Sequence, residues 1–65
     1  GGMMKYKITD HEIDKVTEVE APGIIEAMLE YLTWPTLQLT VDYHPTYGSA
    51  RVMDEVTDFI YDVEF

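Results

Sequence analysis

The sequence predicts an α+β fold in which one helix packs on a small, mainly antiparallel sheet, with the element order ββαββ. Three observations predict it. The chain has 65 residues, enough for one small domain. Hydrophobic residues make up 46% of it, which is too many for a disordered chain. Apolar residues alternate in several segments and follow helical spacing most clearly in one.

Residues 3–65 are expected to form a single domain, because no internal repeat or linker marks a second one. Gly1 and Gly2 precede two methionines and are interpreted as the remnant of a cleaved expression tag. A compact chain of this length should have a radius of gyration of about 11 Å.

The first two segments favour strands. Residues 4–9 alternate between apolar and polar side chains, with Tyr6 and Ile8 on one face. The Val and Thr content of residues 13–21 suits a second strand. A rival interpretation stays open for this second segment, because residues 9–12 match a capping box and would start a short helical turn.

Residues 21–34 predict the helix. Pro22 suits the first helical position, and Glu26 would lie near the positive end of the helix dipole. Pro35 cannot continue the helical hydrogen bonds, so the helix should end by Trp34. The expected apolar stripe consists of Ile25, Met28, Leu29 and Leu32.

Residues 36–43 show the clearest strand alternation. The side chains expected to face the core are Leu37, Leu39, Val41 and Tyr43. The segment 44–50 (HPTYGSA) then predicts a reversal, with a positive φ at Gly48 and a new strand starting near Ser49 or Ala50.

The last segment fits two templates. As a strand, residues 50–65 place Phe59, Tyr61, Val63 and Phe65 on one face. Such a strand is long, so a bulge or bend is expected near residues 54–55. The alternative is that residues 49–63 form a helix capped by Ser49. The strand is favoured by its Val, Thr, Ile, Phe and Tyr content, and because late acids oppose a helix dipole.

Charge narrows the classes of partner. Thirteen acids against four Lys and Arg give a net charge of −9, which disfavours direct binding to nucleic acid or membrane and favours a basic protein surface. The chain lacks cysteine and any apolar run long enough to span a bilayer, so a cytoplasmic location is expected.

No catalytic or metal-binding signature stands out. His11 lies among Asp10, Glu12 and Asp14, but a solvated turn explains this cluster better than a metal site does. Ser49 is the only serine, and so small a domain has little volume for a cleft. We therefore expect no enzyme activity and no cofactor.

The acids near the C-terminus are the candidate binding residues. On a strand, alternate carboxylates recur every ~6.6 Å and would form a row. Duplex DNA as long as this domain is wide, about 28 Å, carries about 16 phosphates. A face that gathers the nine net charges would approach that density. The predicted acidic face comprises Asp54, Glu55, Asp58, Asp62 and Glu64, extended by Glu18 and Glu20.

The segments KVTEVEAPGIIEAMLEYL and LQLTVDYHPTYGSARV, followed by an acidic tail, resemble small acidic phage-encoded ββαβ-type proteins. These include anti-CRISPR and anti-restriction inhibitors that imitate DNA. The resemblance implies a phage or mobile-element inhibitor that blocks the basic groove of a host defence protein in the bacterial cytoplasm. The alternative is a structural or assembly protein that forms a homodimer or pairs through a strand edge. A third interpretation is that the acids only maintain solubility.

Overall fold

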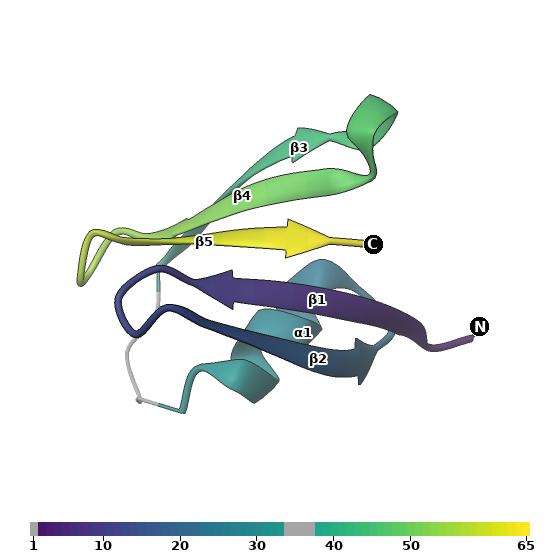
Figure 1. Ribbon diagram of the computed structural model, residues 1–65, viewed down its shortest axis with the longest axis horizontal. Coiled ribbons are helices and arrows are strands. Elements are labelled where there is room, and N and C mark those ends of the chain that lie inside the picture. The colour runs from purple at the N-terminus through teal and green to yellow at the C-terminus, as the bar shows by residue number, and fades with distance from the viewer. Residues whose placement is uncertain (1, 34–37) are drawn as a thin grey trace.

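The computed structural model describes residues 2–33 and 38–65, which form a five-stranded antiparallel sheet with one helix against it (Figure 1). The strand order across the sheet is β2-β1-β5-β4-β3. The radius of gyration is 11.0 Å, as the chain length predicts. In chain order the elements are β1 (Met4–Asp10), β2 (Lys15–Ala21), α1 (Ile24–Tyr31), β3 (Leu39–His44), the short 3-10 helix η1 (Pro45–Tyr47), β4 (Ser49–Asp54) and β5 (Phe59–Glu64).

The predicted order ββαββ is wrong, because three strands follow the helix instead of two. The segment expected to form one bent strand is a hairpin of β4 and β5, and the alternative of a helix over residues 49–63 is wrong as well. The positions of the buried side chains explain the hairpin. Even-numbered residues of β4, such as Val52, and odd-numbered residues of β5, such as Tyr61, are the buried ones. A turn between them lets both sets face the same side of the sheet.

The first hairpin follows the sequence more closely. β1 lies where alternation predicts it, and the second segment is a strand from Lys15 onward, with a turn over residues 11–14 before it. β2 begins at Lys15, however, and Ile13 lies exposed in the preceding turn. Asp14, between Ile13 and β2, adopts a left-handed backbone conformation that a strand does not use, so the strand begins only after it.

The helix is shorter than predicted. Gly23, with extended backbone angles, is its N-cap, so Pro22 lies outside the helix. The buried stripe also differs from the expected one, because Ile24 and Ala27 face the sheet while Leu29 is exposed. Ala27 is small enough to let the helix approach the strands closely. Among the residues that the structure describes, no helix is long and apolar enough to cross a membrane.

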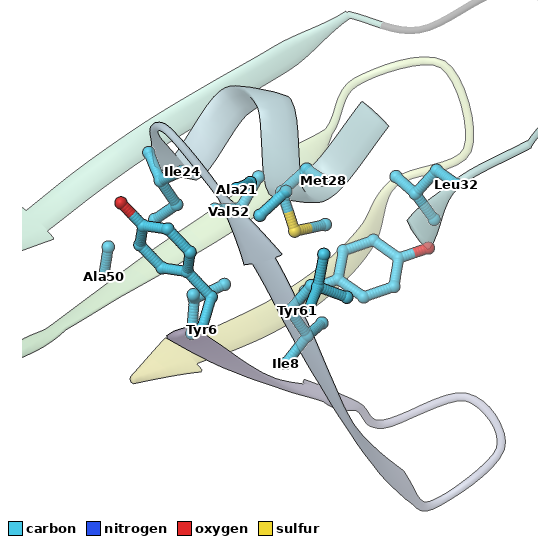
Figure 2. Close-up of a cluster of buried hydrophobic side chains, with 12 residues drawn as sticks. Tyr6, Ile8, Ala21, Ile24, Met28, Leu32, Ala50, Val52 and Tyr61 are labelled. Atoms are coloured by element: carbon cyan, nitrogen blue, oxygen red, sulfur yellow. The ribbon is translucent and has the colours of Figure 1, made fainter. Parts of the chain in front are cut away.

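The core lies between α1 and the inner face of the sheet, with buried side chains from β2, β1, β5 and β4 (Figure 2). Its largest fully buried side chains include Ile8, Met28 and Tyr61. The helix contacts β2 most closely and leaves β3, at the far edge, less covered. For this reason Tyr43, predicted to face the core, is 55% exposed. Leu37, also predicted to face the core, lies outside the described residues.

Candidate functional site

The β1–β2 and β4–β5 turns are built alike. Each follows a buried aspartate that ends a strand, Asp10 in one case and Asp54 in the other. Oδ1 of Asp10 accepts a hydrogen bond from the main-chain N–H of Glu12 at 3.0 Å. Oδ1 of Asp54 accepts one from the main-chain N–H of Val56 at 2.9 Å. A short polar side chain that bonds the backbone two residues ahead fixes the start of a turn.

Each of these turns also ends on an aspartate in the left-handed region. Asp14 has φ 52° and Asp58 has φ 63°. Aspartate tolerates this conformation better than most residues other than glycine. The sequence pattern of both turns is therefore Asp-x-x-x-Asp, with a buried acid first and an exposed acid last.

The two turns lie at the same end of the sheet, because β1 and β5 pair antiparallel with Asp10 opposite Tyr61 (Figure 1). Glu12 from one turn and Asp58 from the other line a single depression of about 350 Å³, which His11, Arg51 and Asp62 line as well. Within residues 2–33 and 38–65, no Lys, Arg or His forms an ion pair with the exposed acids of these turns. We call this group the acidic end; it consists of Glu12, Asp14, Glu55 and Asp58.

The structure divides the predicted acidic face. Glu55 and Asp58 are exposed and belong to the acidic end. Asp54 is fully buried, so its expected place on the surface is wrong. Its carboxylate lies on the inner face of the sheet because Ala50 and Val52, at the same alternation, face the core.

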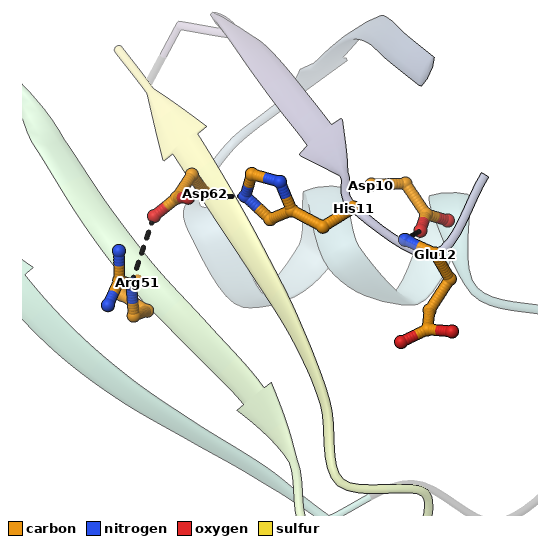
Figure 3. Close-up of polar contacts among 5 residues, drawn as sticks. All are labelled: Asp10, His11, Glu12, Arg51 and Asp62. Carbon is orange, nitrogen blue, oxygen red and sulfur yellow. Dashed lines mark hydrogen bonds and ion pairs between the residues drawn. The ribbon is translucent and has the colours of Figure 1, made fainter. Parts of the chain in front are cut away.

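Asp62 lies on the outer face of the sheet between the side chains of His11 and Arg51 (Figure 3). Its Oδ2 accepts a hydrogen bond from Nε2 of His11 at 2.6 Å, and its Oδ1 accepts one from Nε of Arg51 at 3.1 Å. Partial burial by itself would raise the pKa of this carboxyl. The hydrogen bonds and charges of His11 and Arg51 outweigh burial and lower the pKa.

The remaining predicted acids share the outer face with lysines. Lys7 lies opposite Glu18 on one side and opposite Glu64 on the other. Lys5 lies opposite Glu20, and its Nζ is 4.0 Å from Oε2 of Glu18. Acids and bases therefore alternate across this face, and the predicted row of carboxylates is partly neutralised there.

On the inner side of the acidic end, Asp10 forms a hydrogen bond with the last residue of α1. Its Oδ2 accepts a hydrogen bond from the hydroxyl of Tyr31 at 2.7 Å. Burial, this hydrogen bond and the charge of Asp10 raise the pKa of Tyr31 to about 12.

Tyr61 packs edge to face on Tyr31, with ring centroids 6.1 Å apart. Its buried hydroxyl has no hydrogen-bond partner among the described residues. Burial first, and then the charges of Asp10 and Asp54, raise the pKa of Tyr61 to about 12. The rings of Tyr31 and Tyr61 therefore lie on the inner side of the acidic end, and their hydroxyls stay protonated at neutral pH.

The sequence interpretation did not include Glu12 and Asp14 in the predicted acidic face. The signal that identifies them is the pair of Asp-x-x-x-Asp segments, residues 10–14 and 54–58, which predicts two similar turns. The antiparallel neighbours β1 and β5 then bring these turns to one end of the sheet.

The acidic end can attract cations by charge. In the described part of the chain, no three His, Asp or Glu side chains are arranged to hold a metal ion. No protein-family model, curated protein or solved structure matches the chain.

Proposed function

We propose that this protein is a non-enzymatic acidic binding protein whose acidic end occupies a basic, nucleic-acid-binding surface of another protein. One observation carries the proposal: two similar turns gather exposed carboxylates at one end of the sheet with no counter-charge in ion-pair distance among the described residues. Such a surface complements a cluster of Lys and Arg and raises the rate of association with it.

Apolar side chains beside the carboxylates support a protein partner. Ile13 in one turn is 62% exposed, and Val56 in the other is 50% exposed. Apolar contacts surrounded by polar groups are typical of protein interfaces. The acidic end thus offers both charge and apolar area to a partner.

The biological setting follows from the resemblance to phage-encoded inhibitors. In this proposal the protein belongs to a phage or mobile element and blocks a host defence protein in the bacterial cytoplasm. Its carboxylates lie where phosphates of a nucleic acid would bind. The net charge of −9 on a body 29 Å long supports such competition for a basic groove.

Two charge-matched variants test this proposal. The acidic-end variant carries Glu12→Gln, Asp14→Asn, Glu55→Gln and Asp58→Asn. Asn is used at both left-handed positions because it tolerates that conformation. The sheet-face variant carries Glu18→Gln, Glu20→Gln, Asp42→Asn and Glu64→Gln. Each loses four negative charges, which changes the net charge from −9 to −5.

Binding to an arginine-rich peptide by calorimetry gives the first readout. The acidic-end variant should lose at least tenfold in affinity, or about 1.4 kcal/mol, and the sheet-face variant should lose less. Wild-type affinity should fall between about 50 and about 200 mM salt. Equal losses in the two variants, or affinity independent of salt, would contradict the proposal.

A pull-down from bacterial extract gives the second readout. Wild type and the sheet-face variant should retain nucleic-acid-binding proteins that competing duplex DNA elutes, and the acidic-end variant should not. Retention of the same proteins by the acidic-end variant would show that another surface binds them.

A structural or assembly role is the second candidate. It is favoured by the open edge of β3, which pairs only with β4 among the described strands. An unpaired edge is a template for pairing with another chain.

A further inference from the structure

The hydrogen bonds of β3 to its neighbour show which of its residues direct their main-chain groups to the open edge of the sheet. The main-chain oxygen of Gln38 accepts a hydrogen bond from the N–H of Glu55 at 2.7 Å, so Gln38 faces β4. In an antiparallel pair, residues alternate between facing the neighbouring strand and facing away from it. Leu39, Val41 and Tyr43 therefore direct their N–H and C=O groups to the open edge.

The same residues place their side chains on the inner face of the sheet, beyond the part that α1 covers. Leu39 and Val41 are half-buried, and Tyr43 is exposed. The strand contains no Lys, Arg or Pro, which are among the usual devices against edge pairing, and its one acid, Asp42, lies on the outer face of the sheet.

The other edge of the sheet, β2, is protected. It contacts α1 on its inner face and carries Lys15, Glu18 and Glu20. Antiparallel self-pairing centred on Glu18 sets this acid opposite itself, and pairing centred on Val19 sets Glu18 opposite Glu20. Like charges directly opposite each other are destabilising.

We propose that β3 pairs antiparallel with β3 of a second copy of this chain, with Val41 opposite Val41 on the two-fold axis. The occupant is a second copy because this register sets apolar side chains opposite apolar ones and no two like charges opposite each other. Leu39 then lies opposite the second copy's Tyr43, and Thr40 lies opposite its Asp42. This inference deepens the assembly role and rests on it, and it does not require the acidic end.

Other registers are worse on stated grounds. A shift of one residue pairs groups that face the edge with groups that face β4, and it sets apolar side chains on the polar face. A centre on Asp42 places the two Asp42 carboxylates opposite each other. A centre on Thr40 leaves Tyr43 without a partner among the described residues of the strand.

Centring on Val41 forms the most hydrogen bonds. Each pair of edge-facing residues exchanges two main-chain hydrogen bonds, so pairing over residues 39–43 forms about six. Pairing also covers the exposed ring of Tyr43 with Leu39 of the second copy. The result is a continuous ten-stranded sheet whose acidic ends remain exposed.

Single cysteines test the register, because the chain has no cysteine of its own. In the proposed pairing the two Val41 Cα atoms are about 5.5 Å apart, within the range of a disulfide. The Thr40 Cα atoms, like those of Asp42, would be roughly 8 Å apart, too far to bridge. Under mild oxidation, Val41→Cys should cross-link to a dimer, and Thr40→Cys and Asp42→Cys should not. Preferential cross-linking through either control overturns the register.

Proline at the axis tests the edge itself. The N–H of Val41 faces away from β4, so Val41→Pro keeps the hydrogen bonds of the sheet and removes those across the axis. Size-exclusion chromatography with light scattering should give about twice the mass of one chain for wild type and for Val41→Thr, and the mass of one chain for Val41→Pro. A monomeric wild type at high concentration, or a dimer that survives Val41→Pro, overturns the proposal.

Salt separates this inference from the acidic binding proposed above. Salt screens the repulsion between two acidic copies, so the dimer should become more stable as salt rises. Binding of the acidic end to a basic peptide should weaken over the same range. Val41→Pro should retain peptide binding, and the acidic-end variant should retain the dimer, so either proposal can fail while the other holds.

Discussion

The hydroxyl of Tyr31 donates a hydrogen bond to Oδ2 of Asp10 across 2.7 Å and ties the last turn of α1 to the end of β1. Oδ1 of the same buried carboxylate accepts a hydrogen bond from the main-chain N–H of Glu12 in the turn that follows. One side chain thus joins the helix, the strand and the acidic end. A buried carboxylate in such a position is stabilising only while its hydrogen bonds are complete.

Removing the hydroxyl of Tyr31 and removing that of Tyr61 should have different effects. Tyr31→Phe deprives Asp10 of a partner and should lower the free energy of unfolding by about 1–3 kcal/mol. Tyr61→Phe removes a buried hydroxyl that has no partner among the described residues, so it should be neutral or stabilising. Urea denaturation of both variants checks this. An equal loss in the two would show that the Tyr31–Asp10 bond contributes little.

High pH should destabilise the fold through the same pair. The pKa of Tyr31 and that of Tyr61 rise from 10.0 to about 12 on folding. Their contribution to stability is fully present below pH 10 and is lost as the pH rises towards 12. Each Phe variant should therefore lose stability less steeply than wild type over this window. Denaturation at several pH values, with tyrosinate absorbance as a second readout, measures the slope; identical slopes would contradict the expectation.

Low pH should weaken the contact between Asp62 and its two partners. The folded pKa of Asp62 is lowered from its usual 3.8, so its contribution is present above that value and is lost as pH falls through the folded pKa. The side chain is 39% exposed, so the contribution should be at most about 1 kcal/mol. Asp62→Asn should be less stable than wild type at pH 6 and converge with it in strong acid. A constant difference across this range would rule out ionisation as its cause.

Alternation in the sequence predicted the strand faces where each strand has one buried side. Tyr6 and Ile8 in β1, and Tyr61 and Val63 in β5, are buried as predicted. Alternation alone did not predict that the Tyr43 side chain is exposed, because its exposure depends on how far the helix reaches across the sheet. That reach is a property of the tertiary structure, set by packing of α1 against β2.

The buried acids were harder to predict. Asp10 and Asp54 continue the buried alternation of their strands, but Asp54 was predicted to lie on the surface because aspartate is rarely buried without a partner. Their partners include the N–H groups of the next turn and Tyr31, which lies 21 residues from Asp10. The missed break between β4 and β5 has the same origin, because the turn depends on the carboxylate of Asp54.

Gly48 should not tolerate a side chain. It has φ 63°, and a Cβ there would lie 3.1 Å from the main-chain oxygen of Phe65. The N–H of Phe65 also donates to the oxygen of Gly48 at 2.9 Å. Gly48→Ala should cost about 1–2 kcal/mol, while Gly2→Ala, with no atom within 4 Å of the added carbon, should cost nothing measurable. Thermal denaturation of the two variants checks this, and equal melting temperatures would contradict it.

Low salt should expose the self-repulsion of the acidic end. With a net charge of −9, wild type should melt at a higher temperature as salt is added. The acidic-end variant relieves repulsion between unpaired carboxylates and should melt roughly 2–5 °C above wild type at low salt. The sheet-face variant makes the same change in net charge but removes acids that lie opposite Lys5, Lys7 or Arg51, so it should gain less or lose stability. Melting curves of the three proteins at low and high salt therefore separate local repulsion from net charge. If both variants gained equally, net charge alone would account for the effect, and the acids of the two turns would not form a distinct surface.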